Sequence, residues 1–440
     1  MRLRTAEVAE ITGGTRHGPD VAVAGAAIDS RVLRPGQLFV PVVAARDGHD
    51  FVAAALAAGA AAYLTSRVPQ GGAAVVVEDT TAALAALGRW ARDRLPGPVV
   101  GITGSVGKTS VKDMLGTVLR RRLPTAVSAR SFNNELGVPL TLLGAGDDDG
   151  AAVVEMGARG LGHITWLCEL ARPDIGIVTN VAAAHTELLG SLDGVARAKG
   201  ELVEALPESG TAVLNADDER VAAMAARTRA RVVTFGIEKG DVRAAEVHVD
   251  GELGVTFRLV SPWGEAEVRL GPRGRNQAAN AAAAAAAALA LDVGVDDVAA
   301  GLGEARLSPW RMELRRAPSG ALVINDAYNA NPASAAAALQ ALAETEARRR
   351  VAVLGPMLEL GPESDAEHRR VGELARTLGV DLLVTVNAPA YGGDDVETVE
   401  AVLERLGALG AGDAILVKAS RAAGLERLAA MLLGEEGEPD

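Results

Sequence analysis

The central part of the chain alternates short apolar runs with longer stretches of helical character. The apolar runs have the length and composition of buried strands, and they lie at residues 99–103, 151–155, 175–180, 211–215 and 232–235. Such alternation is typical of a parallel α/β sheet. Near the end of this part, residues 255–260 and 265–270 flank the turn Ser261-Pro-Trp-Gly264 and predict an antiparallel hairpin.

The two flanking parts are shorter and also mix strands with helices. The last part predicts strands at 321–325, 351–354, 382–386 and 414–418 and a helix at 333–346; the first predicts a strand at 36–40 and a helix at 51–59. Proline-bearing junctions at 95–98 and 307–310 separate the parts. We therefore predict an α/β protein of three domains. These are a small α/β N-terminal domain (1–96), a central parallel-sheet domain (97–310) and a Rossmann-like C-terminal domain (311–440).

Composition excludes several classes of protein. With 440 residues and 49% hydrophobic content the chain is globular, and its formal charge of −13 argues against nucleic-acid or anionic-membrane binding. The charged N-terminus and the absence of a long, strongly apolar run predict a cytoplasmic protein without a membrane span. The alanine tract 281–288 predicts a packed soluble helix, and we expect a monomer. A single cysteine, Cys168, excludes an internal disulfide.

Lysine is rare, because the 44 basic residues are 5 lysines and 39 arginines. Where only a positive charge is needed, this sequence uses arginine. A lysine therefore hints at chemistry that a guanidinium cannot perform, such as a compact phosphate contact or a nucleophilic amine. The five are Lys108, Lys112, Lys199, Lys239 and Lys418. Lys239 lies in a turn and is expected to be an ordinary surface residue.

The strongest chemical signal is a glycine-rich loop between the strand at 99–103 and a helix that follows it. The candidate nucleotide-binding residues of this loop are Gly104, Ser105, Val106, Gly107, Lys108, Thr109 and Ser110. Loop amides and a helix N-terminus form an anion cradle, the lysine adds a charge for the outer phosphates, and the threonine hydroxyl can ligate Mg²⁺. Ile102 stands where the strict pattern has glycine, so this is a variant loop. The alternative is a glycine turn with a chance Lys-Thr pair.

Two other strand ends carry candidate metal ligands, because Mg²⁺ prefers several oxygen ligands. Glu155 ends the strand at 151–155, and His185 lies in the loop after the next strand. An ordinary strand-end carboxylate and an ordinary loop histidine are the alternatives. Lys199, in the helical stretch 195–201, would by itself be taken for a solvated lysine.

The chain resembles the Mur ligase family. The phosphate loop and five further segments occur in family order, namely Ser131-Phe-Asn-Asn-Glu-Leu-Gly-Val-Pro139, Glu155-Met-Gly-Ala158, Asn180-Val-Ala-Ala-Ala-His185, Ala198-Lys-Gly-Glu201 and Asp326-Ala-Tyr-Asn-Ala-Asn-Pro332. The match runs from Asp29-Ser-Arg31 to Lys418-Ala-Ser-Arg421. Within the family, the resemblance is to ligases that join D-alanyl-D-alanine to a UDP-N-acetylmuramoyl-tripeptide.

The resemblance implies roles for individual residues. It implies Thr109, Glu155, His185 and a carbamylated Lys199 at Mg²⁺; Asn280, Arg311, Asp326, Asn329 and Asn331 around ATP; and Ser30, Arg31, Asp47 and His49 at the uridine-nucleotide substrate. It also implies a set of catalytic residues, namely Lys108, Lys199, His185 and Arg311. Two departures are Gly274-Arg-Asn-Gln277, where the family usually has a His-Asn pair, and Pro356, where it usually has Asp.

The implied reaction activates a carboxylate as an acyl phosphate, which an amine then attacks. The partners are UDP-N-acetylmuramoyl-tripeptide and D-alanyl-D-alanine. The alternatives are another ligase of the superfamily, either the type that adds the third peptide residue or the folylpolyglutamate type, and a regulatory nucleotide switch. The switch explains the phosphate loop alone and leaves the other motifs unexplained.

Overall fold

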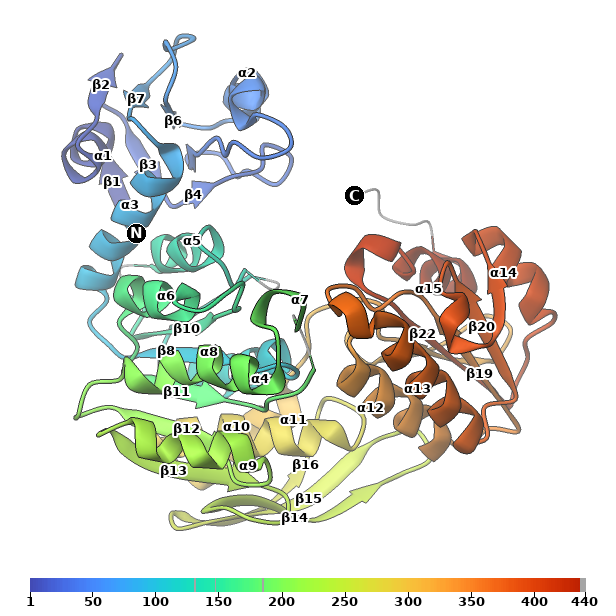
Figure 1. The fold of residues 1–440 in the computed structure, drawn as a ribbon. Coiled ribbons are helices and arrows are strands. Elements are labelled where there is room, and N and C mark those ends of the chain that lie inside the picture. The colour runs from blue at the N-terminus through green and yellow to red at the C-terminus, as the bar shows by residue number, and fades with distance from the viewer. Residues whose placement is uncertain (130–131, 147, 184–185, 436–440) are drawn as a thin grey trace.

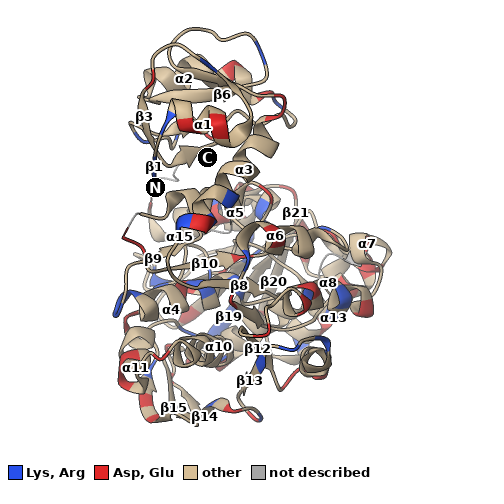
Figure 2. Cartoon of the chain, turned by 90° about the vertical axis from the view of Figure 1, so that its left-hand side faces the viewer, with Lys and Arg blue, Asp and Glu red and all other residues tan. Residues whose placement is uncertain are grey.

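Four β-sheets organise the chain into three α/β bodies (Figure 1). The computed structural model describes residues 1–129, 132–146, 148–183 and 186–435. Within these residues no helix combines the length and the apolar character needed to cross a membrane. Acidic and basic residues are interspersed along the ribbon in Figure 2.

The N-terminal body contains two small sheets. Strands β1 and β3 pair antiparallel, and a second sheet has the order β2-β7-β6-β5-β4, parallel except for β2. The predicted strand at 36–40 is shorter than expected, and the predicted helix at 51–59 is preceded by a 3-10 turn capped by Asp47. The elements are β1 (Arg2–Arg4), α1 (Thr5–Thr12), β2 (Thr15–His17), β3 (Ala22–Ala24), β4 (Ala26–Ala27), β5 (Leu38–Phe39), η1 (Gly48–Phe51), α2 (Val52–Ala57), β6 (Ala62–Thr65), β7 (Ala74–Val76) and α3 (Thr80–Arg94).

The central body is built on a sheet of order β16-β15-β14-β13-β12-β11-β8-β10-β9. Strands β9 to β13 pair in parallel with β8 and one another, and β14, β15 and β16 form the antiparallel end. The predicted parallel strands and the hairpin are confirmed. The strands are β8 (Val99–Thr103), β9 (Thr125–Val127), β10 (Ala151–Glu155), β11 (Ile175–Val178), β12 (Thr211–Asn215), β13 (Arg231–Gly236), β14 (Val242–Val249), β15 (Val255–Ser261) and β16 (Gly264–Arg269).

Helices cover both faces of this sheet (Figure 1). The alanine tract forms the core-facing part of α10, where Ala281 to Ala288 have no solvent exposure. Small side chains let a helix approach a sheet and a neighbouring helix closely, so the predicted packed helix is confirmed. The helices are α4 (Lys108–Arg120), α5 (Gly137–Gly144), α6 (His163–Ala171), α7 (Thr186–Leu189), α8 (Leu192–Glu204), α9 (Glu219–Ala222), η2 (Ala223–Arg227), α10 (Asn276–Ala290) and α11 (Val295–Glu304).

The C-terminal body has a sheet of order β17-β18-β22-β19-β20-β21, parallel except for β17. All four predicted strands and the predicted helix are present. The elements are β17 (Glu313–Arg316), β18 (Leu322–Asn325), α12 (Pro332–Glu344), β19 (Arg349–Leu354), η3 (Gly361–Glu363), α13 (Ser364–Thr377), β20 (Leu382–Val386), η4 (Pro389–Tyr391), β21 (Asp394–Val396), α14 (Val399–Leu406), β22 (Asp413–Lys418), η5 (Arg421–Ala423) and α15 (Glu426–Leu433).

Candidate active site

The glycine-rich loop joins β8 to α4 at the carboxyl edge of the central sheet. Gly104 has φ of 150° and Gly107 has φ of 89°, and a side chain at either position would collide with a neighbour. A Cβ at Gly104 would lie 1.8 Å from Thr179 Oγ1, and one at Gly107 would lie 2.3 Å from Asn280 Oδ1. Both glycines are therefore needed for the loop to turn tightly under its neighbours.

The segment that follows β11 holds the loop in place. The Val106 amide donates to Asn180 Oδ1 at 2.9 Å, and Thr179 Oγ1 donates to the Val106 carbonyl at 2.6 Å. Ser105 Oγ donates to the Ala182 carbonyl at 3.0 Å. These contacts fix the loop backbone at the N-terminus of α4, where amides and the helix dipole favour an anion.

Lys108 and Thr109 begin α4 and face two different groups. Lys108 Nζ donates to the Gly104 carbonyl at 2.7 Å; burial lowers the pKa of Lys108, and nearby Glu155 partly opposes this shift. Thr109 Oγ1 donates to Glu155 Oε2 at 2.7 Å, and Asn133 Nδ2 donates to the other carboxylate oxygen at 2.9 Å. Glu155 is only 1% exposed. Threonine and carboxylate oxygens thus lie together beside the phosphate loop, as the sequence predicted.

Lys199 is buried in α8, with 2% exposure. Burial lowers its pKa well below the usual value, and the positive charge of Lys108 lowers it further. Its amine has no hydrogen bond or ion pair within the described residues. The alternative that Lys199 is an ordinary solvated lysine is therefore wrong, because its side chain is buried. His185 lies outside the described residues, so its predicted metal role stays a prediction.

Arg311 enters the site from the linker before β17. Its guanidinium carbon lies 4.2 Å from the centre of the Tyr328 ring, and its buried Nε has no hydrogen-bond partner in the described chain. The residues on either side, Trp310 and Met312, have φ of 61° and 48°, a conformation that side chains other than glycine rarely adopt. A strained linker therefore presents a partly buried cationic side chain that can bind an anion.

The segment after β18 forms the opposite wall. Asp326 Oδ2 accepts from Lys418 Nζ at 2.6 Å, and Asp326 Oδ1 accepts from the Met312 amide at 3.0 Å. Lys418 also donates to the Asn329 carbonyl at 2.9 Å. Asn331 caps α12 by accepting from the Ser334 amide at 2.9 Å. Asp326 and Asn331 thus shape this wall through internal contacts, while the Asn329 side chain is exposed.

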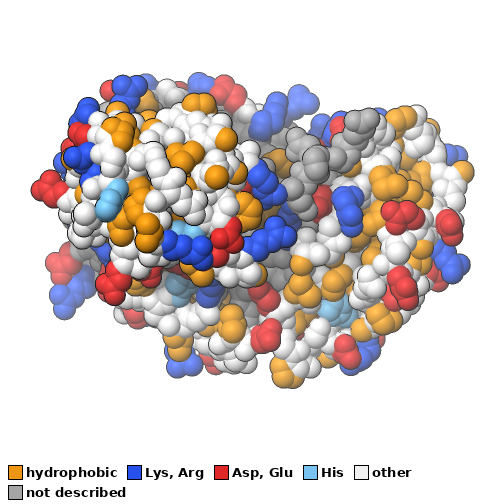
Figure 3. Space-filling view, turned by 90° about the horizontal axis from the view of Figure 1, so that it is seen from above, with side chains coloured by type: hydrophobic (Ala, Val, Ile, Leu, Met, Phe, Trp, Pro, Cys, Tyr) orange, Lys and Arg blue, Asp and Glu red, His pale blue; other side chains and the backbone are white. Residues whose placement is uncertain are grey.

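A cavity of about 550 Å³ unites these groups. Seen from above, the N-terminal and C-terminal bodies stand on either side of a hollow edged by Lys and Arg side chains (Figure 3). Among the predicted residues, those lining the cavity are Ser105, Val106, Gly107, Lys108, Thr109, Ser110, Glu155, Asn280, Arg311, Asp326, Asn329 and Asn331. Gly104 lies at the base of the loop, and Lys199 is buried outside the lining.

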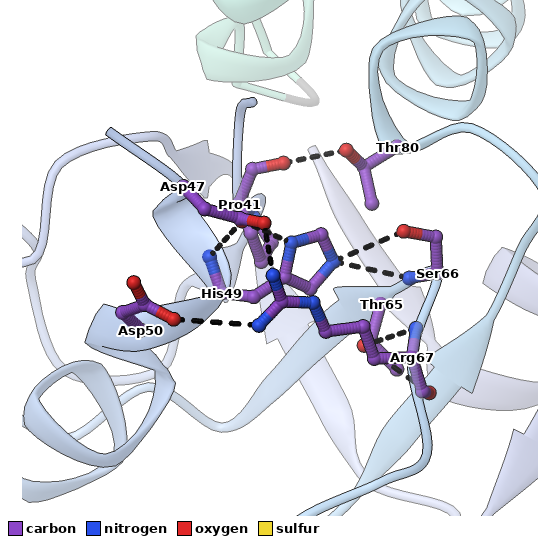
Figure 4. Close-up of polar contacts among 8 residues, drawn as sticks. All are labelled: Pro41, Asp47, His49, Asp50, Thr65, Ser66, Arg67 and Thr80. Carbon is purple, nitrogen blue, oxygen red and sulfur yellow. Dashed lines mark hydrogen bonds and ion pairs between the residues drawn. The ribbon is translucent and has the colours of Figure 1, made fainter. Parts of the chain in front are cut away.

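The four predicted substrate residues lie in the N-terminal body and do not line this cavity. His49 is 2% exposed and accepts from the Ser66 amide at Nε2, 3.1 Å away, so its proton is on Nδ1 and is donated to Asp47 at 2.6 Å (Figure 4). Arg67 bridges Asp47 and Asp50. Arg31 pairs with Asp29 at 2.9 Å, and Ser30 is half-buried. The internal network orders the loop around Asp47, and the substrate assignment stays a prediction.

Other cavity residues were missed from the sequence. Asn133 orients Glu155, Lys418 holds Asp326, and Arg159, Tyr328 and Arg421 line the walls. The rarity of lysine was a usable signal for Lys418. Like Lys112 and Lys199, it is buried, whereas Lys239 is exposed as expected.

A phosphate-binding loop that faces a second α/β body across a polar cavity is the geometry of a nucleotide-binding site. The Mur ligase middle domain matches residues 102–288, and the Mur ligase, glutamate ligase domain matches residues 310–436. The family matches identify the chain as an ATP-dependent ligase. The chain belongs to the Mur ligase family, and its three-domain architecture is that of the family.

The sequence matches to named relatives cover nearly the whole chain. The UDP-N-acetylmuramoyl-tripeptide–D-alanyl-D-alanine ligase of Escherichia coli is 38% identical, covering 97% of this chain and 98% of that protein. The ligase of the same name from Mycobacterium tuberculosis is 41% identical, covering 99% and 98%. A crystal structure of MurF from Acinetobacter baumannii has a TM-score of 0.87 at 31% identity, covering 99% of each chain. MurF from Thermotoga maritima in complex with ADP has a TM-score of 0.81 at 29% identity, covering 94% and 98%.

Proposed function

We propose that this chain joins D-alanyl-D-alanine to UDP-N-acetylmuramoyl-tripeptide with consumption of ATP. A carboxylate oxygen of the tripeptide attacks the γ-phosphorus and ADP leaves; the dipeptide amine then attacks the acyl carbon and phosphate leaves. The observation that carries the proposal is the single cavity shared by the phosphate loop and the Arg311–Asn331 segments. Names and near-complete coverage of the relatives support the two substrates.

ATP phosphates would lie on the loop amides, with Lys108 at the outer phosphates. Arg311 would contribute a second positive charge from the linker, where its Nε has no hydrogen-bond partner among the described residues. Alignment and charge neutralisation by such groups supply most of the rate enhancement in phosphoryl transfer. Asn280, next to Gly107, and the exposed Asn329 would contact the adenosine side of the nucleotide.

The oxygen set beside the loop fits Mg²⁺. Thr109 Oγ1 and the Glu155 carboxylate are 2.7 Å apart, and hard oxygen donors are what this cation prefers. A carbamate on Lys199 would add anionic oxygens, and His185 is the remaining candidate ligand. The lowered pKa of Lys199 favours the neutral amine that reacts with carbon dioxide. When bound, Mg²⁺ would neutralise charge on the phosphates and the acyl phosphate.

The domain roles follow from this arrangement. Residues 1–96 would bind the uridine nucleotide, residues 97–310 would bind ATP, and residues 311–440 would complete the nucleotide site. Ser30, Arg31, Asp47 and His49 are the candidates in the first domain. The network around His49 gives that domain a fixed loop on which a substrate could dock.

Turnover tests the function directly. Release of ADP by the purified protein should require both a UDP-N-acetylmuramoyl-tripeptide and D-alanyl-D-alanine. A panel that includes UDP-N-acetylmuramoyl-dipeptides with a free diamino acid, and folate with glutamate, distinguishes the other ligase types. A nucleotide switch would hydrolyse ATP slowly and without regard to these substrates, which would contradict the proposal.

A further inference from the structure

The linker between the central and C-terminal bodies is held at its two ends by different bodies. At its start, Leu307 packs against the central core, and the Ser308 amide donates to Asp113 Oδ2 at 2.7 Å. Asp113 lies on α4, which begins at the phosphate-binding Lys108. The first half of the linker is therefore part of the central body.

The second half of the linker belongs to the C-terminal body. The Trp310 carbonyl accepts from the Tyr328 amide at 3.2 Å, and the Arg421 guanidinium lies 4.3 Å from the Trp310 ring centre. The Met312 amide donates to Asp326 at 3.0 Å. Between the two halves stands Pro309, which is exposed. Its ring fixes φ, so its ψ is the soft dihedral about which the two bodies can turn.

Asp113 is itself held by a buried cation. Its Oδ1 lies 2.9 Å from Lys112 Nζ, and the side chains are 2% and 11% exposed for Lys112 and Asp113. Lys112 also donates to the Ser128 carbonyl at 2.7 Å, and Ser128 Oγ accepts from the Glu155 amide at 3.2 Å. One buried ion pair thus connects the linker, the phosphate-loop helix and the backbone of the candidate metal ligand.

A second contact connects the segment that precedes the linker to the end of helix α4. Helix α11 precedes the linker, and its last residue, Glu304, pairs with Arg121 at 2.6 Å, just after the end of α4. Arg121 is about one-third exposed, so this pair contributes little energy by itself. The buried Lys112–Asp113 pair is different, because removing one partner leaves a charge without compensation. The Lys112–Asp113 pair is therefore the contact that fixes the position of the Asp113 carboxylate.

We propose that Asp113 is a positioning residue for domain closure: it anchors the central end of a pivot at Pro309 to the helix that carries Lys108, and Lys112 holds Asp113 in place. This proposal deepens the proposed function and rests on it. Closure must bring Arg311, two residues beyond Pro309, to a defined place relative to the phosphate loop. Anchoring the pivot on the phosphate-loop helix makes that place reproducible, and misplacement by about 1 Å can cost about 10²-fold in rate.

Two matched double variants isolate the anchor. Lys112→Met/Asp113→Asn removes both charges and keeps an oxygen that can accept from the Ser308 amide. Lys112→Met/Asp113→Leu removes both charges and that acceptor, with a side chain of similar size. We expect kcat of the Leu variant to fall at least about 10-fold below that of the Asn variant. The dissociation constant of a non-hydrolysable ATP analogue should agree between the two within about 3-fold, because the loop and Lys108 are unchanged.

Small-angle scattering of the full chain provides a readout that does not depend on turnover. With analogue and both substrates, the Asn variant should contract as the wild type does, and the Leu variant should contract less. Equal kcat and equal contraction of two folded variants would overturn the proposal, as would loss of analogue binding in the Leu variant alone. If the Leu variant does not fold, Ser308→Pro, which removes the amide donor and also fixes φ at residue 308, is compared with Ser308→Ala, which keeps the donor; equal kcat in that pair also overturns the proposal. Failure of the wild type to ligate these substrates would instead contradict the proposed function.

Discussion

The two joints between the three bodies are held by different kinds of contact. At the first joint, helix α3 of the N-terminal body packs on α5 and α6, and one apolar cluster runs across the predicted boundary at residue 96. Leu84 and Leu87 on one side and Val138 and Leu170 on the other belong to this cluster, and all are fully buried. Gly88 lets α3 approach so closely that a Cβ there would lie 2.8 Å from Pro139 Cβ.

The second joint is mainly polar. The central and C-terminal bodies have separate apolar clusters, apart from Leu253 and the partly buried Val249, which join a C-terminal cluster from the central hairpin region. Partly exposed ion pairs span the joint, such as Arg275–Glu344 at 2.7 Å and Arg316–Glu252 at 2.5 Å. The cavity of the candidate active site also lies at this joint and is lined by residues of both bodies.

This difference indicates where the molecule is rigid and where it moves. Burial of apolar surface contributes about 25 cal/mol per Å², whereas an exposed ion pair contributes about 0–1 kcal/mol. Opening the first joint would expose an apolar core, while opening the second would mainly break partly exposed ion pairs and expose polar surface. We therefore expect the first two bodies to move as one and the C-terminal body to close onto the nucleotide, with its hinge within residues 307–311.

The largest expected effect is on chemistry at the second joint. Lys108→Ala should reduce ligation by about 10²- to 10³-fold or more, because it removes a charge aligned with the transferred phosphoryl group. The fold should be unchanged, since within the described part of the chain the only hydrogen bond of the Lys108 ammonium is to the Gly104 carbonyl. Activity and circular dichroism of the purified variant provide the measurement. Substantial activity in a folded variant would contradict the nucleotide site.

Lys199→Ala should lose at least about 10-fold in activity and regain part of it with short-chain carboxylic acids. Such acids can occupy the vacated volume and restore the negative charge of a carbamate. Acidification should act in the same direction as the mutation, because protonation of the amine removes the form that is carbamylated. Mass spectrometry of a carbamate-trapped sample adds an independent readout. Near-normal turnover of the variant would exclude the role.

At the first joint, Gly88→Val should destabilise the protein by about 1–3 kcal/mol, because the side chain would overpack against Pro139. Chemistry should be spared, so kcat per folded molecule should stay close to that of the wild type. Ala82→Val is the matched control, since Ala82 is exposed on the same helix. Denaturant unfolding compares the two variants, and equal stability would show that the joint is not closely packed.

The smallest effect is expected for the ion pairs that span the second joint. Arg316→Gln removes the contact with Glu252, whose side chain is 56% exposed, and should change the free energy of unfolding by less than about 1 kcal/mol. Arg229→Gln, which removes an exposed pair within the central body, should behave alike. A much larger loss of unfolding free energy for Arg316→Gln would show that this ion pair holds the second joint strongly.

The buried parallel strands of the central and C-terminal bodies were the most predictable parts of the fold. Five apolar runs predicted the parallel strands of the central body because buried strands need continuous apolar residues. The loop at 104–110 was predictable because a phosphate cradle needs glycines at fixed spacing. The short edge strands β9, β17 and β21 and the long β14 were not assigned, since partly exposed strands carry a weaker hydrophobic pattern.

The site was only partly predictable, because many of its contacts join residues that are far apart in the chain. Ser308 and Asp113 are 195 positions apart, and no local pattern connects them. Asn133 next to Glu155, and Lys418 next to Asp326, are likewise products of the tertiary fold. The local sequence pattern identifies residues that can take part in binding or catalysis, but tertiary packing determines which of them are in contact.

Two distances measured on one protein test the central claim most directly. Cysteines at Glu10, Lys239 and Glu404, introduced in pairs, place labels on exposed sites of the three bodies. The native Cys168 should stay unlabelled, because burial raises its pKa to about 12. When an ATP analogue and both substrates are added, the distance between labels at 239 and 404 should shorten, and that between 10 and 239 should stay constant. No change in the first distance, or a change in the second, would contradict a rigid first joint and a closing second joint.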